Sequence, residues 1–249
     1  MLTQERHQYI LKALDEKKAV TVADLTKELN TSESTIRRDL NTLAKQGKLN
    51  KVHGGATYVE LQNSVTHEQQ VELRRRIRSS KKDMIGRYAA SLIEPEDFVY
   101  IDAGTTTGSM ISYLTETNAI YMTNSMEIAS KLVRRGFETY TVGGRIRQIT
   151  EAIVGSQAEH SIEDFHFSKG FFGVNGISLD ADYSTPDIEE ARIKRLAMSK
   201  SYKAYVLSDS SKFSVNSSVT FGKIEDATII TDKLPDKIYR EHTIVIEVE

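Results

Sequence analysis

Apolar residues recur every three to four positions in three stretches of the first 45 residues. This spacing predicts three amphipathic helices, each with one buried face. The apolar positions are Ile10, Leu11 and Leu14 in the first helix, Leu25 and Leu29 in the second, and Ile36, Leu40 and Leu43 in the third. Thr3 and Thr21 stand where N-terminal caps belong, and Gly47 stands where the third helix should end. The three-residue turn between the second and third helices has the spacing of a helix-turn-helix.

A different pattern follows in KLNKVHGGATYV, residues 48–59. Leu49, Lys51 and Val52 alternate around a His-Gly-Gly turn, which is typical of a small β-hairpin. Beside a helix-turn-helix, such a hairpin is the wing of a winged helix. Residues 1–60 are therefore predicted to form a winged helix-turn-helix domain.

Short apolar runs alternate with helical patterns through the rest of the chain. The runs are FVYIDAG, AIYMTNS, ETYTVGG, KGFFGVNG, AYVLSD, ATIITD and TIVIEV, and the clearest helical patterns are EIASKLVRR and PDIEEARIKRLAM. In the second helical pattern, Ser184 or Thr185 is the expected N-terminal cap and Pro186 the first turn. This alternation predicts an α/β domain with a largely parallel sheet over residues 83–249.

The net charge of −2 conceals a large difference in charge between the two predicted parts of the chain. Residues 1–82 carry a net charge of +6, and the remaining residues carry −8. A basic first part favours a polyanion as its partner. Residues 61–82 form a predicted basic linker, in which six Lys and Arg residues fall within nine positions. This stretch is as consistent with an extra contact to a DNA backbone, or a relay between the domains, as it is with a solvated linker.

Composition removes several classes of function. The chain of 249 residues has no cysteine, which excludes disulfides, zinc–thiolate sites and thiol nucleophiles. Its six histidines include no i,i+4 pair, so we expect no metal site, and we expect no cofactor. No apolar run approaches the ~18 residues of a membrane span, and the first residues are charged, so we expect a cytoplasmic protein with no membrane partner.

The third predicted helix presents polar residues opposite its apolar stripe. In a helix-turn-helix the second helix of the motif enters the major groove, where arginine can bond guanine or clamp a phosphate. Any single arginine is more simply a solvated surface residue, but the pattern as a whole predicts binding to double-stranded DNA. The predicted DNA-binding residues are Ser34, Thr35, Arg37, Arg38 and Asn41 of the helix and Lys48, Lys51 and His53 of the wing. Asp39 is expected on the flank of the helix, paired with a basic side chain.

The stretch TIRRDLNTLAKQGKLNKVHGGA resembles the N-terminal signature of the DeoR family of bacterial transcription regulators. The second half of the chain supplies further matches. The resemblance implies a winged helix-turn-helix followed by a sugar-phosphate-sensing domain similar in fold to ribose-5-phosphate isomerase and glucosamine-6-phosphate deaminase. It also implies a repressor of a sugar-utilisation operon that a phosphorylated sugar releases from its operator. One winged helix covers too little DNA to select a single site, so we expect a homodimer or higher homo-oligomer.

Polar and glycine-rich loops follow several predicted strands, where open α/β sheets bind ligands. They are DAGTTTG (residues 102–108), Asn124 with Ser125, Gly143 with Gly144, and the GVNG turn at 173–176. Each loop alone is as well explained by helix capping, and Glu190 with Lys194 is as well explained by an i,i+4 ion pair. The predicted effector-binding residues are Asp102, Gly104, Thr105, Thr106, Thr107, Asn124, Ser125, Gly143, Gly144, Asn175, Glu190, Lys194 and Lys212.

The resemblance also implies an arrangement for the effector. It puts Thr105, Thr106 and Thr107 nearest the phosphate. The side chains that it puts around the sugar are those of Asp102, Asn124, Asn175, Glu190 and Lys212. The alternative function is a sugar-phosphate isomerase with a DNA-binding appendage. Asn175 stands where the related enzymes typically carry an aspartate, which argues against proton transfer, although Glu190 could still act as a base. We therefore expect no enzyme activity.

Overall fold

The structure is a computed structural model that describes residues 3–17, 19–45, 49–52, 54–57 and 79–248. The chain divides into two compact units, Met1–Gln62 and Asn63–Glu249. Helix α5 begins at Ser79, inside the span 61–82 that the sequence predicts as a linker. Ser79 to Lys82 are therefore helical and belong to the second unit.

Within its described residues, the first unit contains three helices and a small antiparallel sheet. Its elements are α1 (Thr3–Lys17), β1 (Ala19–Thr21), α2 (Val22–Glu28), α3 (Glu33–Lys45), β2 (Asn50–Val52) and β3 (Gly55–Thr57). The strand order is β1-β3-β2, so β1 extends the predicted hairpin on the side of β3. The sequence did not predict β1, because a three-residue strand with one buried side chain has too little pattern to detect.

The apolar stripes of the three helices meet in one core. Ile10, Leu14, Leu25 and the α3 stripe are buried there, which confirms the predicted helix faces. Leu11 and Leu29 pack at its edge and are only partly buried. Thr21 ends β1 and caps α2, since its hydroxyl accepts a hydrogen bond from the Asp24 amide at 3.0 Å.

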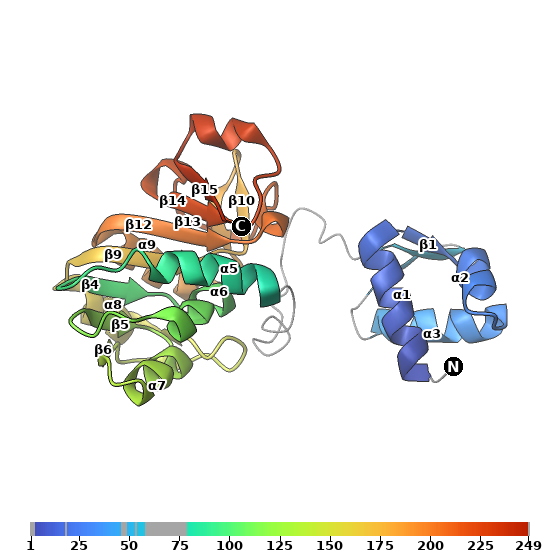
Figure 1. Cartoon of the computed structure of the whole chain (residues 1–249), viewed down its shortest axis with the longest axis horizontal. Helices are drawn as coiled ribbons and strands as arrows, with labels where there is room; N and C mark the ends of the chain where they lie inside the picture. The colour runs from blue at the N-terminus through green and yellow to red at the C-terminus, as the bar shows by residue number, and fades with distance from the viewer. Residues whose placement is uncertain (1–2, 18, 46–48, 53, 58–78, 249) are drawn as a thin grey trace. The chain divides into compact units, whose positions relative to one another are not determined.

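The second unit is built on a seven-stranded parallel sheet with strand order β15-β14-β12-β9-β4-β5-β6 (Figure 1). Every strand of this sheet arises from one of the seven predicted apolar runs. In chain order they are β4 (Phe98–Ile101), β5 (Ile120–Thr123), β6 (Glu138–Thr141), β9 (Phe167–Gly173), β12 (Ser201–Ser208), β14 (Thr228–Thr231) and β15 (Val245–Glu247).

Helices cover both faces of this sheet. Alternate residues of β4 point to opposite sides, so Val99 and Ile101 join one core and Tyr100 joins the other. Helices α5 (Ser79–Ala90), η1 (Met110–Tyr113) and α7 (Met126–Arg134) pack into the first core, and the short helix α6 (Thr105–Ser109) contacts α5. Helices α8 (Ser156–Glu163) and α9 (Ile188–Ser199) pack into the second core.

The second unit also contains a small hairpin, a small antiparallel sheet and three short helices in its described residues. They are the hairpin β7 (Arg145–Ile146) with β8 (Ile153–Val154), the antiparallel sheet of β10 (Gly176–Ser178), β11 (Asp182–Thr185) and β13 (Val219–Gly222), and the short helices η2 (Ser210–Lys212), η3 (Ile224–Asp226) and η4 (Lys237–Glu241). The cap expected at Ser184 or Thr185 is wrong, because both residues lie in β11. Asp187 caps α9 instead and accepts hydrogen bonds from the amides of Glu189 and Glu190.

Candidate functional sites

Helix α3 separates its residues by polarity as the sequence predicts. Ser34, Arg37, Arg38 and Asn41 are exposed, and Thr35 is half-buried. The opposite face carries the apolar stripe, so the polar face points away from the core of its own unit. Arg37 is paired with Glu33 one turn earlier at 3.0 Å, with both side chains more than half exposed. Such an exposed pair is weak and is easily exchanged for a phosphate or a base.

Asp39 is buried at the α1–α3 contact. Its carboxylate accepts from Arg6 Nε at 2.5 Å and Nη2 at 3.1 Å, and it lies 3.0 Å from His7 Nε2. Burial alone would raise the pKa of Asp39, but the hydrogen bonds from Arg6 and His7 outweigh it and lower the pKa. The prediction that Asp39 pairs with a basic side chain is confirmed. Its charge holds α1 to α3 and does not oppose a polyanion.

The wing depends on two consecutive glycines. Gly54 has φ of +82°, which side chains rarely adopt, and a Cβ on Gly55 would overlap the Val20 carbonyl oxygen of β1. Lys51 is exposed on β2. Lys48 and His53, the other predicted DNA-binding residues of the wing, lie outside the described residues.

In the second unit, an ion pair joins the end of β4 to α9. Lys194 Nζ donates to Asp102 Oδ2 and, at 3.0 Å, to the Gly173 carbonyl oxygen. The Gly173 amide donates to the same carboxylate at 3.0 Å. Asp102 is 1% exposed and Lys194 is 3% exposed. Burial raises the pKa of Asp102, and Lys194 opposes that rise.

The three threonines of the first loop have different environments. Thr105 and Thr106 are half-buried at the start of α6. Thr107 is fully buried, and its hydroxyl donates to the carbonyl oxygens of Asp102 at 2.7 Å and Gly104 at 3.0 Å. Thr107 therefore holds the shape of the loop, as the helix-capping alternative predicts.

Lys82 of α5 reaches the same loop. Its side chain is buried, and Nζ donates to Thr105 Oγ1 at 2.9 Å. The Ser109 hydroxyl donates to the Lys82 carbonyl oxygen at 2.7 Å, which ties α5 to α6. Sequence reasoning missed Lys82 as a site residue because it ends a run of basic residues that indicates solvent exposure. The amphipathic pattern that begins beside it is the signal that could have found it.

The second loop holds the first in place. Asn124 Oδ1 accepts from the Ala103 amide at 2.9 Å, and Ser125 caps α7 by accepting from the Ile128 amide at 3.3 Å. Both side chains are buried. The described contacts of Asn124 and Ser125 are therefore those of a structural support.

Further predicted residues come from three separate segments of the chain. Gly143 and Gly144 lead into the β7–β8 hairpin, and both are exposed. Asn175 is half-buried, and its Oδ1 accepts from the Thr185 hydroxyl at 3.2 Å. Lys212 ends η2 and is half-buried.

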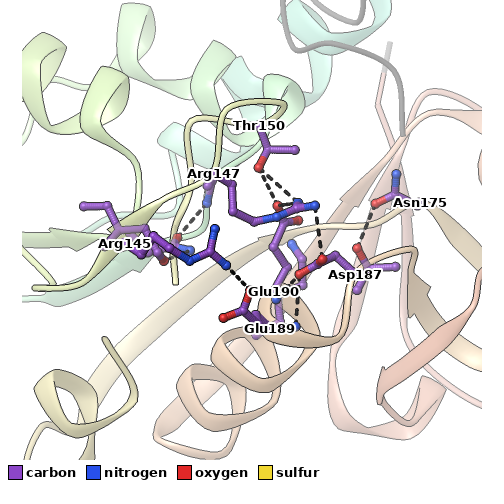
Figure 2. Close-up of polar contacts among 12 residues, drawn as sticks. Arg145, Arg147, Thr150, Asn175, Asp187, Glu189 and Glu190 are labelled. Atoms are coloured by element: carbon purple, nitrogen blue, oxygen red, sulfur yellow. Dashed lines mark hydrogen bonds and ion pairs between the residues drawn. The ribbon is translucent and has the colours of Figure 1, made fainter. Parts of the chain in front are cut away.

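Glu190 belongs to a buried cluster with Arg147 and Thr150 (Figure 2). Arg147 Nη1 donates to Glu190 Oε1 at 2.5 Å, and the Thr150 hydroxyl donates to the same oxygen. Arg147 Nη2 lies 3.1 Å from Asp187 Oδ2. The i,i+4 ion pair between Glu190 and Lys194 is not the pairing found, because each binds a partner from a separate part of the chain. Arg147 and Asp187 were missed, since nothing local in the sequence connects them to Glu190.

Comparison with known families accounts for nearly the whole chain. Residues 6–62 match the DeoR-like helix-turn-helix domain, and residues 77–233 match the DeoR C-terminal sensor domain. The chain belongs to the DeoR family. Both DeoR domains are thus present, and the chain is a DNA-binding transcription regulator. Every predicted effector residue, together with Lys82 and Arg147, falls within the match to the DeoR sensor domain.

Several curated DeoR-type relatives extend over almost the same length. The chain is 38% identical to an uncharacterised HTH-type transcriptional regulator FruR of Bacillus subtilis, over 98% of both chains. It is 34% identical to a putative aga operon transcriptional repressor of Escherichia coli, over 86% of this chain and 80% of the relative. It is 30% identical to a lactose phosphotransferase system repressor of Streptococcus mutans, over 93% of both.

Solved structures give more distant matches. Ribose 5-phosphate isomerase A of Methanocaldococcus jannaschii matches with a TM-score of 0.39 and 12% identity over 54% of both chains. The sorbitol operon regulator SorC of Klebsiella pneumoniae matches with a TM-score of 0.36 and 10% identity over 83% of this chain and 88% of that one. In the part of the chain that the structure describes, no helix is long and apolar enough to cross a membrane, and no group of three or more His, Cys, Asp or Glu side chains could hold a metal ion.

Proposed function

We propose that this DeoR-family regulator represses a sugar-utilisation operon and leaves its operator when a phosphorylated sugar binds the second unit. The observation that carries the proposal is the convergence of Lys82, Thr105 and the Asp102–Lys194 pair on one loop at the carboxyl end of β4. Repressor names among the relatives, including those of the lactose phosphotransferase system and of the aga operon, support the sugar class.

The phosphate is proposed to bind at Thr105 and Thr106. Lys82 supplies positive charge there, since its ammonium group already donates to the Thr105 hydroxyl at 2.9 Å. Charge-assisted hydrogen bonds to phosphate are about twice as strong as neutral ones. A phosphate at this position would therefore accept hydrogen bonds from the Lys82 ammonium group and from the threonine hydroxyls.

The sugar is proposed to lie toward Asp102, Asn175, Glu190, Lys194 and Lys212. Carboxylate, amide and ammonium groups together offer both donors and acceptors to hydroxyl groups. Asp102 and Glu190 each bind a cation already, which fixes their oxygens in place. Fixed acceptors suit recognition of one arrangement of hydroxyls, because little ordering remains to be done on binding.

The same contacts argue against catalysis by an isomerase-like mechanism. A base that moves a proton between neighbouring carbons needs a carboxylate tuned to accept it. Glu190 Oε1 receives hydrogen bonds from Arg147 and Thr150, and Asp102 is bound to Lys194. Incubation with ribose 5-phosphate, fructose 6-phosphate and fructose 1-phosphate should therefore give binding without isomer formation. Turnover that disappears in Glu190→Gln would show that the protein is an enzyme.

Operator binding is proposed to use α3 and the wing of a homo-oligomer, whose two-fold symmetry matches paired half-sites. The decisive experiment titrates sugar phosphates by calorimetry into the full chain, with and without an operator duplex selected from random DNA. A tenfold loss of operator affinity corresponds to about 1.4 kcal/mol, and reciprocity requires the operator to weaken the sugar phosphate by the same factor. Equal sugar-phosphate affinities in the two titrations would refute the release mechanism.

A further inference from the structure

The β7–β8 hairpin is built onto the two loops that follow β4 and β5. Ala152 and Val154 of the hairpin form a buried apolar cluster with Ala103. The Ile153 amide donates to the Asn124 carbonyl oxygen at 2.7 Å, and Asn124 Nδ2 donates back to the Ile153 carbonyl oxygen at 3.4 Å. The base of the hairpin therefore shares its contacts with two of the predicted effector loops.

The far end of the hairpin has a fixed backbone. The Arg147 amide donates to the Ala152 carbonyl oxygen at 2.8 Å, and the Glu151 amide donates to the Arg147 carbonyl oxygen at 2.8 Å. At the entrance, Gly144 has φ of +139°, and a Cβ there would lie 2.7 Å from the Val154 carbonyl oxygen. This closed turn aims the Arg147 side chain at the first turn of α9.

Two arginines of the hairpin bind acids of α9 in different surroundings (Figure 2). The Arg147 side chain is 14% exposed and bridges Asp187 and Glu190, whose side chains are 22% and 6% exposed. The Arg145 side chain is 61% exposed and binds Glu189. An exposed pair contributes little, whereas a guanidinium between two shielded carboxylates fixes both of them. Arg145 is therefore a natural control for Arg147.

Glu190 stands between this hairpin and the Asp102–Lys194 pair. Burial is the main cause of the raised pKa of Asp102, and the charge of Glu190, one turn before Lys194 on α9, adds to it. Both hydrogen bonds to the Glu190 carboxylate are made to Oε1, so within the described residues Oε2 accepts none. Oε2 is consequently the carboxylate oxygen that keeps the capacity to accept a hydrogen bond from a ligand hydroxyl.

We propose that Arg147 determines which sugar phosphate the second unit accepts, by holding Glu190 so that Oε2 receives a hydrogen bond from one hydroxyl of the sugar. Arg147 acts here as a positioning residue. The inference deepens the proposed function and rests on it. A site built to bond a hydroxyl discriminates strongly against analogues that lack it or present it elsewhere, because its polar groups are then left unpaired.

The test is calorimetric titration of the full chain with inorganic phosphate and a panel of hexose and pentose phosphates that includes epimer pairs. The variants are Arg147→Ala, Arg147→Lys and the control Arg145→Ala. In Arg147→Ala we expect the affinity for the best sugar phosphate to fall at least tenfold and its preference over the epimer to fall toward one. Inorganic phosphate should bind within twofold of wild type, because it contacts the loop at Thr105. Arg147→Lys should recover part of the preference, and Arg145→Ala should match wild type.

The outcomes separate this inference from the proposed function. An unchanged preference between epimers in Arg147→Ala overturns the role of Arg147 and leaves the sugar-phosphate site standing. Failure of every sugar phosphate to bind the wild-type chain overturns the proposed function and this inference together. If circular dichroism shows Arg147→Ala unfolded, Thr150→Val decides the question, since it removes only the hydroxyl that bonds Glu190 Oε1. An unchanged epimer preference in Thr150→Val then refutes the proposal.

Discussion

Lys194→Met should destabilise the second unit far more than the same substitution of an exposed lysine. Methionine keeps much of the length and the apolar stem of lysine but removes the ammonium group. The substitution leaves the Asp102 carboxylate, 1% exposed, without the cation that binds it. Removing one partner of a buried ion pair costs about 3–5 kcal/mol. For a unit of this size that corresponds to a fall of roughly 6–20 °C in melting temperature.

The loss of unfolding free energy in Lys194→Met should depend on pH, and the pKa of Asp102 sets the direction of that dependence. Burial raises the pKa of Asp102 above its value in the unfolded chain, and Lys194 opposes this rise. A group with a raised pKa contributes its full stability below the unfolded pKa and loses it as pH rises through the folded pKa. Loss of Lys194 raises the folded pKa further. The deficit of Lys194→Met relative to wild type should therefore be largest near pH 8 and shrink as the pH falls toward 5.

Urea unfolding followed by near-ultraviolet circular dichroism measures this effect selectively. The chain has no tryptophan, and Tyr100, Tyr121 and Tyr183 are fully buried in the second unit. Lys203→Met is the matched control, because Lys203 is exposed on β12 and should change stability by less than about 0.5 kcal/mol. A deficit below about 1 kcal/mol, or one that is equal at pH 5 and pH 8, would refute the role given to this ion pair.

Three further predictions concern the two proposed sites and the α1–α3 contact. Arg37→Ala and Arg38→Ala should each cost roughly 1–3 kcal/mol of operator affinity without changing sugar-phosphate binding, and wild-type affinity in both variants would contradict the proposed recognition helix. Thr105→Val keeps the shape of threonine but removes the hydroxyl, so calorimetry should show weaker binding of a phosphorylated ligand. The ligand-free variant should keep its operator affinity. If the variant loses DNA binding as well, the loop has a purely structural role. Asp39→Asn should destabilise the first unit by about 1–3 kcal/mol at pH 7. Since the lowered pKa of Asp39 gives stability that is lost as pH falls through the folded pKa, the variant and wild type should converge in acid, and an undiminished difference there would contradict the contact with Arg6.

The sequence predicted the elements that have strong local patterns. The seven strands of the main sheet follow from continuous apolar runs, which parallel strands covered on both faces require. The apolar residues of α3 at 3–4 spacing predict that helix. The pairing of Asp39 with a basic side chain was predicted because an unpaired acid beside a polyanion is unfavourable. By contrast, β1, β7 and β8 are two or three residues long, which is too short for a local pattern to identify them, and β1 also depends on its pairing with the distant β3.

The candidate sites were predicted by residue type but not by pairing. Asp102 lies at a strand end and Glu190 and Lys194 lie on α9, where the sequence places them, and their binding of an effector stays a prediction. Their partners could not be read from spacing, because Asp102 and Lys194 are 92 positions apart and Arg147 and Glu190 are 43 apart. Lys82 was assigned to the linker because it ends a run of basic residues, a pattern that indicates solvent exposure. Only the packing of α5 on α6 turns a residue of that basic run toward Thr105.

The order of the two units along the chain also sets the order in which they are completed during synthesis. The first unit is complete within 62 residues, whereas the Asp102–Lys194 pair needs the chain to extend through α9. At a synthesis rate of about 5–20 residues per second, roughly 7–26 seconds separate the two. A nascent or truncated chain that ends between these points carries the whole recognition helix and none of the completed ion pairs around α9. Any DNA binding by such a fragment would be insensitive to sugar, so nonsense mutations in the second half are expected to differ in phenotype from those in the first.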